Sequence, residues 1–107
     1  MTRPLILAVA IAAIAIPFMP SKSDAGILSR ACMRSDRKAA TRPMCNCIQQ
    51  VANQNLSRAD QRLAASFFSD PHKAQEIRQS DTRGHEQFWS RYKEFGTVVA
   101  ASCGHLR

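Results

Sequence analysis

Four cysteines are the residues whose types and spacing could support the most specific chemistry in this chain. Cys45 and Cys47 are two residues apart, Cys32 precedes them, and Cys103 lies far downstream. Thiolates beside methionines and histidines would suit a soft metal ion, whereas oxidised sulfurs would form two disulfides. The three histidines do not have a spacing typical of a metal site, and neither Cys-x-x-Cys nor Cys-x-x-Cys-His occurs. We therefore expect structural disulfides, no metal site and no cofactor.

Helix geometry limits how these cysteines can pair. Residues two apart on a helix project about 200° apart, so Cys45 and Cys47 should bond to different neighbours and not to each other. Two pairings remain open. We prefer Cys32–Cys45 with Cys47–Cys103, because Cys47 and Cys103 both lie near the expected core, over Cys32–Cys47 with Cys45–Cys103.

A second group of reactive side chains lies within residues 70–89, a segment dense in hydrogen-bonding groups. Ser80, Asp81 and His85 are the residue types of an acyl-transfer triad. No Gly-x-Ser-x-Gly elbow accompanies them, and these types occur together in many polar loops. A hydrolase or redox enzyme is therefore the third hypothesis, and we expect the protein not to be an enzyme.

The same segment is where we expect a binding site. Arg78 and Asp81 have the i,i+3 spacing of an ion pair, and His85 and Trp89 share a helix face. Caps, surface pairs and a half-buried tryptophan would explain these residues equally well. The candidate binding residues are Gln75, Arg78, Asp81, His85 and Trp89.

The beginning of the chain has the pattern of an export signal. Arg3 precedes an apolar stretch over residues 5–16, and small residues occupy the −3 and −1 positions of a cleavage site near Ala25-Gly26. We expect a signal peptide over residues 1–25 and a single periplasmic or secreted domain over residues 26–107. Retention of the apolar stretch as an anchor is the alternative.

Cleavage would leave 13 of the 15 basic and 7 of the 8 acidic residues, so the mature chain would be strongly basic. This balance favours an anionic partner, either an envelope surface or a protein. Export and the dispersed basic residues argue against nucleic acid. After residue 25 no apolar run approaches the ~20 residues of a transmembrane segment.

Helices should dominate the mature chain, because proline and glycine are sparse and no segment alternates with a period of two. The fold class predicted is all-α, a small bundle of four or five short helices stapled by two disulfides. The expected helices cover about 27–35, 43–55, 58–68, 71–79 and 85–103.

Caps and apolar stripes define these helices further. Ser57 with Asp60 resembles a capping box, Asp70 precedes a proline as an N-cap, and Gly104 suits a C′ glycine. The last helix carries the stripe Phe88, Tyr92, Phe95, Val99 and Cys103. The third helix should bury Ala59, Leu63, Ala64 and Phe67. The second helix should have an outer, amide-rich side of Gln49, Gln50, Asn53 and Gln54.

Several segments together resemble a family of small exported alphaproteobacterial proteins. They are Cys45-x-Cys47, Leu56-Ser57-Arg58-Ala59-Asp60-Gln61-Arg62, Phe67-Phe68-Ser69-Asp70-Pro71-His72, Ile77-Arg78-Gln79-Ser80-Asp81 and Phe88-Trp89-x-Arg91-Tyr92-Lys93-x-Phe95. Members of this family often carry the label "arginine transporter". The resemblance implies export and a shared fold, and it assigns no functional residues.

Three functional hypotheses follow. The leading one is a non-enzymatic binding or interaction module for an envelope or protein partner. The second is small-ligand binding related to arginine, or a transport-accessory role, because a permease would need several spanning helices. The enzyme described above is the third.

Overall fold

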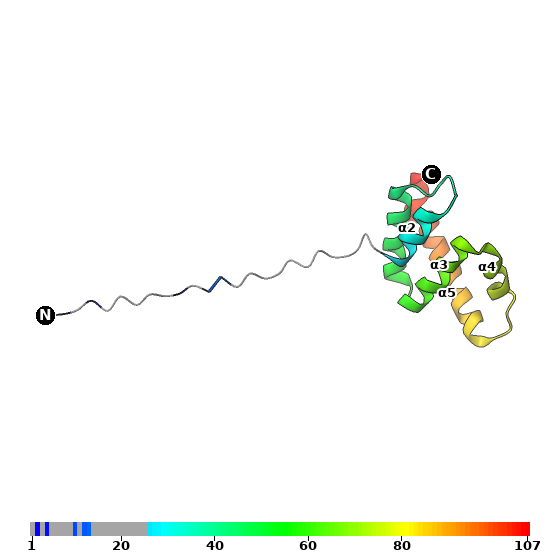
Figure 1. The fold of residues 1–107 in the computed structure, drawn as a ribbon. Helices are drawn as coiled ribbons and strands as arrows, with labels where there is room; N and C mark the ends of the chain where they lie inside the picture. The colour runs from blue at the N-terminus through cyan, green and yellow to red at the C-terminus, as the bar shows by residue number, and fades with distance from the viewer. Residues whose placement is uncertain (1, 3, 5–9, 11, 14–25) are drawn as a thin grey trace.

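The computed structural model describes residues 26–107, together with positions 2, 4, 10, 12 and 13. The described chain is all-α, with five helices and a final 3₁₀ turn (Figure 1). The predicted fold class is therefore confirmed. The predicted signal peptide, residues 1–25, lies outside the described residues except at those five positions. The elements are α1 (Ile27–Arg34), α2 (Arg42–Asn55), α3 (Arg58–Ser69), α4 (Pro71–Arg78), α5 (Arg83–Cys103) and η2 (Gly104–Leu106).

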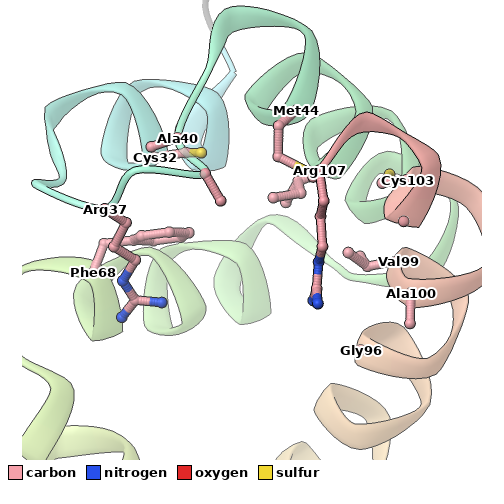
Figure 2. Close-up of a pocket in the computed structure, with 13 residues that line it drawn as sticks. Cys32, Arg37, Ala40, Met44, Phe68, Gly96, Val99, Ala100, Cys103 and Arg107 are labelled. Carbon is pink, nitrogen blue, oxygen red and sulfur yellow. The ribbon is translucent and has the colours of Figure 1, made fainter.

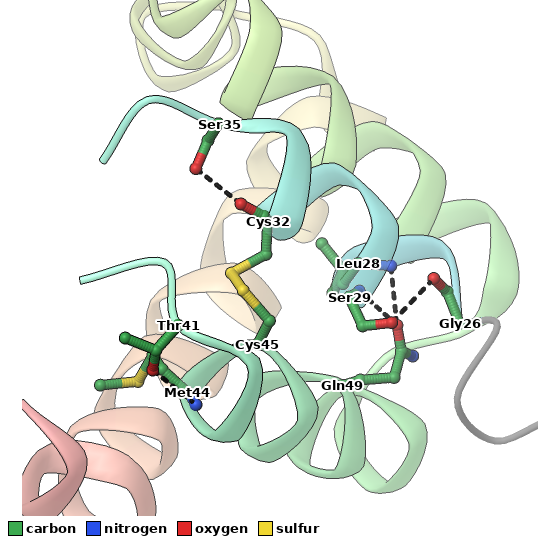
Figure 3. Close-up of a disulfide and its surroundings, with 9 residues drawn as sticks. All are labelled: Gly26, Leu28, Ser29, Cys32, Ser35, Thr41, Met44, Cys45 and Gln49. Carbon is green, nitrogen blue, oxygen red and sulfur yellow. Dashed lines mark hydrogen bonds between the residues drawn. A yellow bond between two sulfur atoms is a disulfide. The ribbon is translucent and has the colours of Figure 1, made fainter. Parts of the chain in front are cut away.

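Two disulfides bond α2 covalently to its neighbours. Cys32 of α1 bonds to Cys45 with a Cα–Cα distance of 5.5 Å, as Figure 3 shows. Cys47 bonds to Cys103 of α5 with a Cα–Cα distance of 5.9 Å. The preferred pairing is confirmed, and all four cysteines are oxidised. Two disulfides in a chain of this size are consistent with an extracellular protein.

None of the helices in the described part of the chain has the length and apolar character needed to cross a membrane.

The core forms where α5 packs against α2 and α3. The predicted stripe of α5 faces it, with Phe88, Phe95 and Cys103 buried. The ring of Phe67 from α3 meets Phe88 edge-on, with the ring centroids 6.0 Å apart. It meets Tyr92 in the same way at 5.3 Å. Such edge-to-face contacts are favourable for aromatic rings, so this cluster joins α3 to α5.

The inner face of α3 differs from the prediction at its first turn. Ala64 and Phe67 are buried as expected, and Leu63 is half-buried, but Ala59 is exposed. Gln61 takes the inward position there and is only 5% exposed. The expectation for Ala59 was wrong because a buried polar side chain occupies the first turn of the inner face.

The predicted N-cap of α3 is confirmed, whereas the predicted capping box is not. Ser57 Oγ accepts a hydrogen bond from the Asp60 N–H at 3.1 Å, as expected for an N-cap. The Asp60 carboxylate does not complete a capping box and instead accepts two bonds from Arg91 of α5, at 2.7 and 3.1 Å. The Arg91 guanidinium donates two charge-assisted hydrogen bonds to the carboxylate, whereas the backbone N–H of Ser57 could donate only one. This explains why Asp60 pairs with Arg91 and does not complete the capping box. Together these bonds fix the start of α3 against α5.

Two other predicted ends behave differently from expectation. Asp70 stands before α4, but its side chain makes no cap hydrogen bond. Its backbone N–H instead closes α3 on the Ser66 carbonyl, because Asp70 ends one helix while it begins the next. Helix α5 ends at Cys103 as predicted, yet Gly104 has φ −59° and the chain continues into the 3₁₀ turn. No left-handed glycine is needed there.

Two buried amides join the ends of three helices. Gln49, 3% exposed, accepts hydrogen bonds from the backbone N–H groups of Leu28 and Ser29 at 2.7 and 2.9 Å (Figure 3). Its Nε2 donates to Gln61 Oε1 at 2.9 Å. Gln61 in turn donates to the Leu56 carbonyl just beyond α2 at 3.2 Å. The prediction that Gln49 lies on an outer side of α2 was therefore wrong.

Gln49 supplies the cap that α1 lacks in its own sequence. Gly26 stands at the N-cap position and has no side chain to accept the first N–H groups. A Cβ atom built at Gly26 would overlap the amide of Gln49, so glycine is what allows Gln49 to reach these groups. An N-cap from another helix makes the start of α1 depend on α2.

We expect Gln49→Ala to lower the free energy of unfolding by about 3 kcal/mol. The substitution removes the oxygen that accepts from two buried backbone N–H groups of α1 and the amide that donates to Gln61. Losing a buried hydrogen-bond partner costs about 1–3 kcal/mol per group, and partial relaxation should keep the total near the lower end of the sum. Urea unfolding followed by circular dichroism would measure it. The matched control is Gln50→Ala, at the next, exposed position of α2. Equal losses in the two variants would contradict the role given to Gln49.

Candidate functional site

The five residues predicted to bind a ligand lie on α4, in the connection that follows it and on the first half of α5. Gln75, Arg78 and Asp81 are exposed, whereas His85 and Trp89 are half-buried. The ion pairs in the described residues join His72 to Glu76 and Arg91 to Asp60, so Arg78 does not pair with Asp81. No side-chain hydrogen bond of the described residues joins these five residues to one another.

The Ser80 hydroxyl and the His85 ring do meet. Ser80 Oγ lies 2.7 Å from His85 Nδ1 and accepts a hydrogen bond from the Thr82 N–H at 3.3 Å. Thr82 is the N-cap of α5, and its hydroxyl accepts a bond from the His85 N–H. Asp81 has no hydrogen bond to His85 in the described part of the chain. The contact therefore has the form of a helix cap, and the acid that would orient a catalytic histidine is not in place.

Trp89 lines a cavity that the other four predicted residues do not reach. The cavity has a volume of about 250 Å³, and its walls include Ile48 of α2, Phe68 of α3 and Gly96 of α5. The charged residue on its wall is Lys93, and no carboxylate lines it. A guanidinium ligand requires acidic partners, so the chemistry of this cavity does not suit arginine.

A basic surface around α1 was not anticipated as a site. We call Arg30, Arg34, Arg42 and Arg62 the α1 basic face. Arg30 and Arg34 line two neighbouring surface hollows, of which one also contains Arg42 and the other Arg62. All four side chains are exposed, and none has an acidic partner among the ion pairs of the described residues. The fold thus gathers four unpaired guanidinium groups from three helices.

This arrangement has an energetic cost that an anion would relieve. Arg30 and Arg34 are four residues apart on α1, and like charges at this spacing destabilise a helix by about 0.2–0.5 kcal/mol.

Met33 lies beside these two arginines and is 46% exposed. Among the described residues it is the one large hydrophobic side chain that is exposed. The i,i+4 spacing is visible in the sequence, but Arg42 and Arg62 join the face only through the fold.

Comparisons with known protein families, with curated proteins and with solved structures find no match. The function must therefore be inferred from the side chains themselves.

Tyr92 beside Trp89 reports on the environment of this region. Its ring lies 5.2 Å from Trp89, measured between centroids, and burial raises the pKa of its hydroxyl, while the charge of Arg37 acts in the opposite direction. Tyr92 is the single tyrosine of the chain, so a phenolate absorbance titration observes it alone. We expect the folded protein to titrate above the value of about 10 found in water.

The raised pKa makes stability depend on alkaline pH. Above pH about 10 the unfolded chain has lost the phenol proton while the folded chain keeps it, so stability must fall as the pH rises. Urea unfolding measured at several pH values should show a smaller fall in the free energy of unfolding for Tyr92→Phe than for the wild type.

Arg37→Gln should raise the pKa of Tyr92 further, because it removes a charge that favours the phenolate. A titration of the folded wild type at or below the unfolded value would refute this assignment.

Proposed function

We propose that this protein is a non-enzymatic binding module of the periplasm or the cell exterior. It docks through the α1 basic face on a phosphate-bearing anionic surface, namely the lipid headgroups of the envelope. The observation that carries this proposal is the convergence of four exposed, unpaired arginines on two adjoining hollows.

Arginine chemistry supports a phosphate partner. The guanidinium fork binds phosphate oxygens in a bidentate manner and is weakly hydrated, so it loses little on docking. Several forks on one face can contact several headgroups at once, whereas a small anion would occupy one hollow. Met33, exposed within the same face, adds an apolar side chain that suits the headgroup region.

Export is part of the same proposal. The signal-like residues 1–25 and the family resemblance both favour translocation, and the two disulfides suit an oxidising compartment. Arginine binding, which the label of similar proteins suggests, remains the alternative. It has less support because the charged side chains that line the two hollows and the Trp89 cavity are all basic, and none is a carboxylate.

A vesicle-binding measurement tests the docking proposal. The chain is expressed with its leader, purified in oxidised form and sedimented with vesicles of phosphatidylcholine, either alone or mixed with phosphatidylglycerol. Binding should require phosphatidylglycerol and weaken as added salt shortens the Debye length from ~30 Å to ~8 Å. The double variant Arg30→Gln/Arg34→Gln should bind about 30-fold more weakly, since each basic residue near an anionic surface contributes about 1 kcal/mol.

The matched control removes the same charge elsewhere. Arg78→Gln/Arg83→Gln changes two exposed arginines at the α4–α5 end of the molecule, so its binding should stay within about threefold of wild type. Equal losses in the two double variants would show that net charge alone acts, against the proposal. Binding to phosphatidylcholine alone, or salt-independent binding, would also contradict it.

A further inference from the structure

Two adjoining cavities form an apolar groove beside α5, which we call the α5 groove. Each has a volume of about 250 Å³, and they share Ile48, Phe68, Gly96 and Val99 on their walls. The first is shown in Figure 2, between Phe68 on one side and Val99 and Ala100 on the other. Phe68, Ile48 and Val99 are only half-buried along this groove. The groove therefore leaves apolar surface open to solvent.

Basic side chains stand along this apolar groove. Arg37 and Arg107 line the first cavity, and Lys93 lines the second. In Figure 2 the guanidinium groups of Arg37 and Arg107 extend in the same direction from the cavity walls. Arg37 lies over the Phe68 ring, 5.2 Å from its centroid. No aspartate or glutamate lines either cavity, so the charged side chains that an anion would meet there are all basic.

Gly96 lies on the wall that the two cavities share. It lies inside α5, where glycine weakens a helix relative to alanine, and its backbone does not need the freedom of glycine. Apart from its chain neighbours and the adjacent backbone of its own helix, no atom of the described chain lies within 4 Å of a Cβ built at Gly96. The missing side chain thus gives no packing advantage inside the protein. Because position 96 has no side chain, the space between the two cavities stays open at this point.

We propose that the α5 groove binds a single-chain amphiphile with an anionic head group. The alkyl chain lies on Ile48, Phe68 and Val99, where it covers the open apolar surface. The head group is held by the guanidinium groups of Arg37 and Arg107, which bind carboxylate and phosphate alike. A free fatty acid and a lysophospholipid share this chemistry. None of the four arginines of the α1 basic face lines this groove, although Phe68 also borders one of their hollows, and the proposal does not depend on the docking proposed for that face.

Trp89 provides a direct readout, since it is the single tryptophan of the chain and lines the groove. The oxidised protein, expressed with its leader, is titrated with dodecanoate below its micelle-forming concentration while tryptophan fluorescence is recorded. A saturable change is expected. Dodecyltrimethylammonium has the same chain with a cationic head, and we expect it to bind at least about tenfold more weakly. Dodecyl phosphate is the third arm, and a preference for it over dodecanoate favours a phosphate head group, as in a lysophospholipid, over the carboxylate of a fatty acid.

Gly96→Leu tests the position of the ligand. The added side chain fills the shared wall of the groove and meets no protein atom at Cβ, so the fold should be kept while dodecanoate affinity falls at least about tenfold. Gly84→Leu is the matched control, because Gly84 also lies in α5 with open space at its Cβ, but outside the groove. It should bind dodecanoate as wild type does. Circular dichroism confirms that both variants are folded.

Two further variants keep the proposal falsifiable if Gly96→Leu does not fold. Arg37→Gln/Arg107→Gln should weaken dodecanoate binding about tenfold or more, and it should not weaken the binding of dodecyltrimethylammonium. Arg30→Gln/Arg34→Gln should bind dodecanoate normally, so a failure of the envelope-docking proposal is distinguishable from a failure of this one.

Four results would overturn the proposal. They are no saturable response to either anionic amphiphile, equal affinity for the cationic one, wild-type binding by a folded Gly96→Leu, and a dimer in analytical ultracentrifugation that Gly96→Leu dissociates. The last would show that a second copy of the chain covers the groove.

Discussion

The bonds made by Cys45 and Cys47 hold α2 between α1 and α5, and the rest of the structure depends on this constraint. The two sulfurs leave α2 in different directions, so a single helix is fixed on two sides. On the chain-entropy estimate the shorter loop contributes about 3 kcal/mol and the longer one about 4 kcal/mol. These amounts are comparable to the whole stability of a small domain. Without the two disulfides, a domain with a core of this size would be only marginally stable.

The proposed surfaces are consequences of the same constraint. Cys32 and Cys103 both line the α5 groove, so each disulfide borders the place where an amphiphile would bind. The α1 basic face needs α1 to stay beside α2 and α3. The Cys32–Cys45 bond holds one end of α1, and the Gln49 amide caps the other (Figure 3). Helix α1 has only eight residues, too few to be stable alone, so both attachments are required.

Sequence patterns were sufficient for the parts of the fold that local chemistry decides. The apolar stripe of α5, the Ser57 cap and the five helices are each determined by nearby residues. The cysteine spacing excluded one pairing of three and could not separate the other two, because that choice depends on how the helices pack. Gln49 was assigned to an outer side because polarity alone predicts exposure. Its burial requires partners on α1 and α3, which no local pattern reveals.

The functional surfaces were less predictable for the same reason. The segment around His85 and Trp89 was identified by its density of polar groups, and the fold uses the Ser80–His85 contact at a helix cap. The α5 groove is assembled from residues as distant as Cys32, Phe68 and Arg107, so no window of sequence contains it. Gly96 was its one local sign, as a glycine inside a helix with no turn to make.

The most direct test of this account is the disulfide map of the native protein. No lysine or arginine separates Cys45 from Cys47, so unreduced peptides must be fragmented at the intervening Asn46 by electron-transfer dissociation and read by mass spectrometry. The account predicts Cys32 joined to Cys45, Cys47 joined to Cys103, and no thiol that alkylates before reduction. Alkylated cysteines, or Cys32 joined to Cys47, would contradict it.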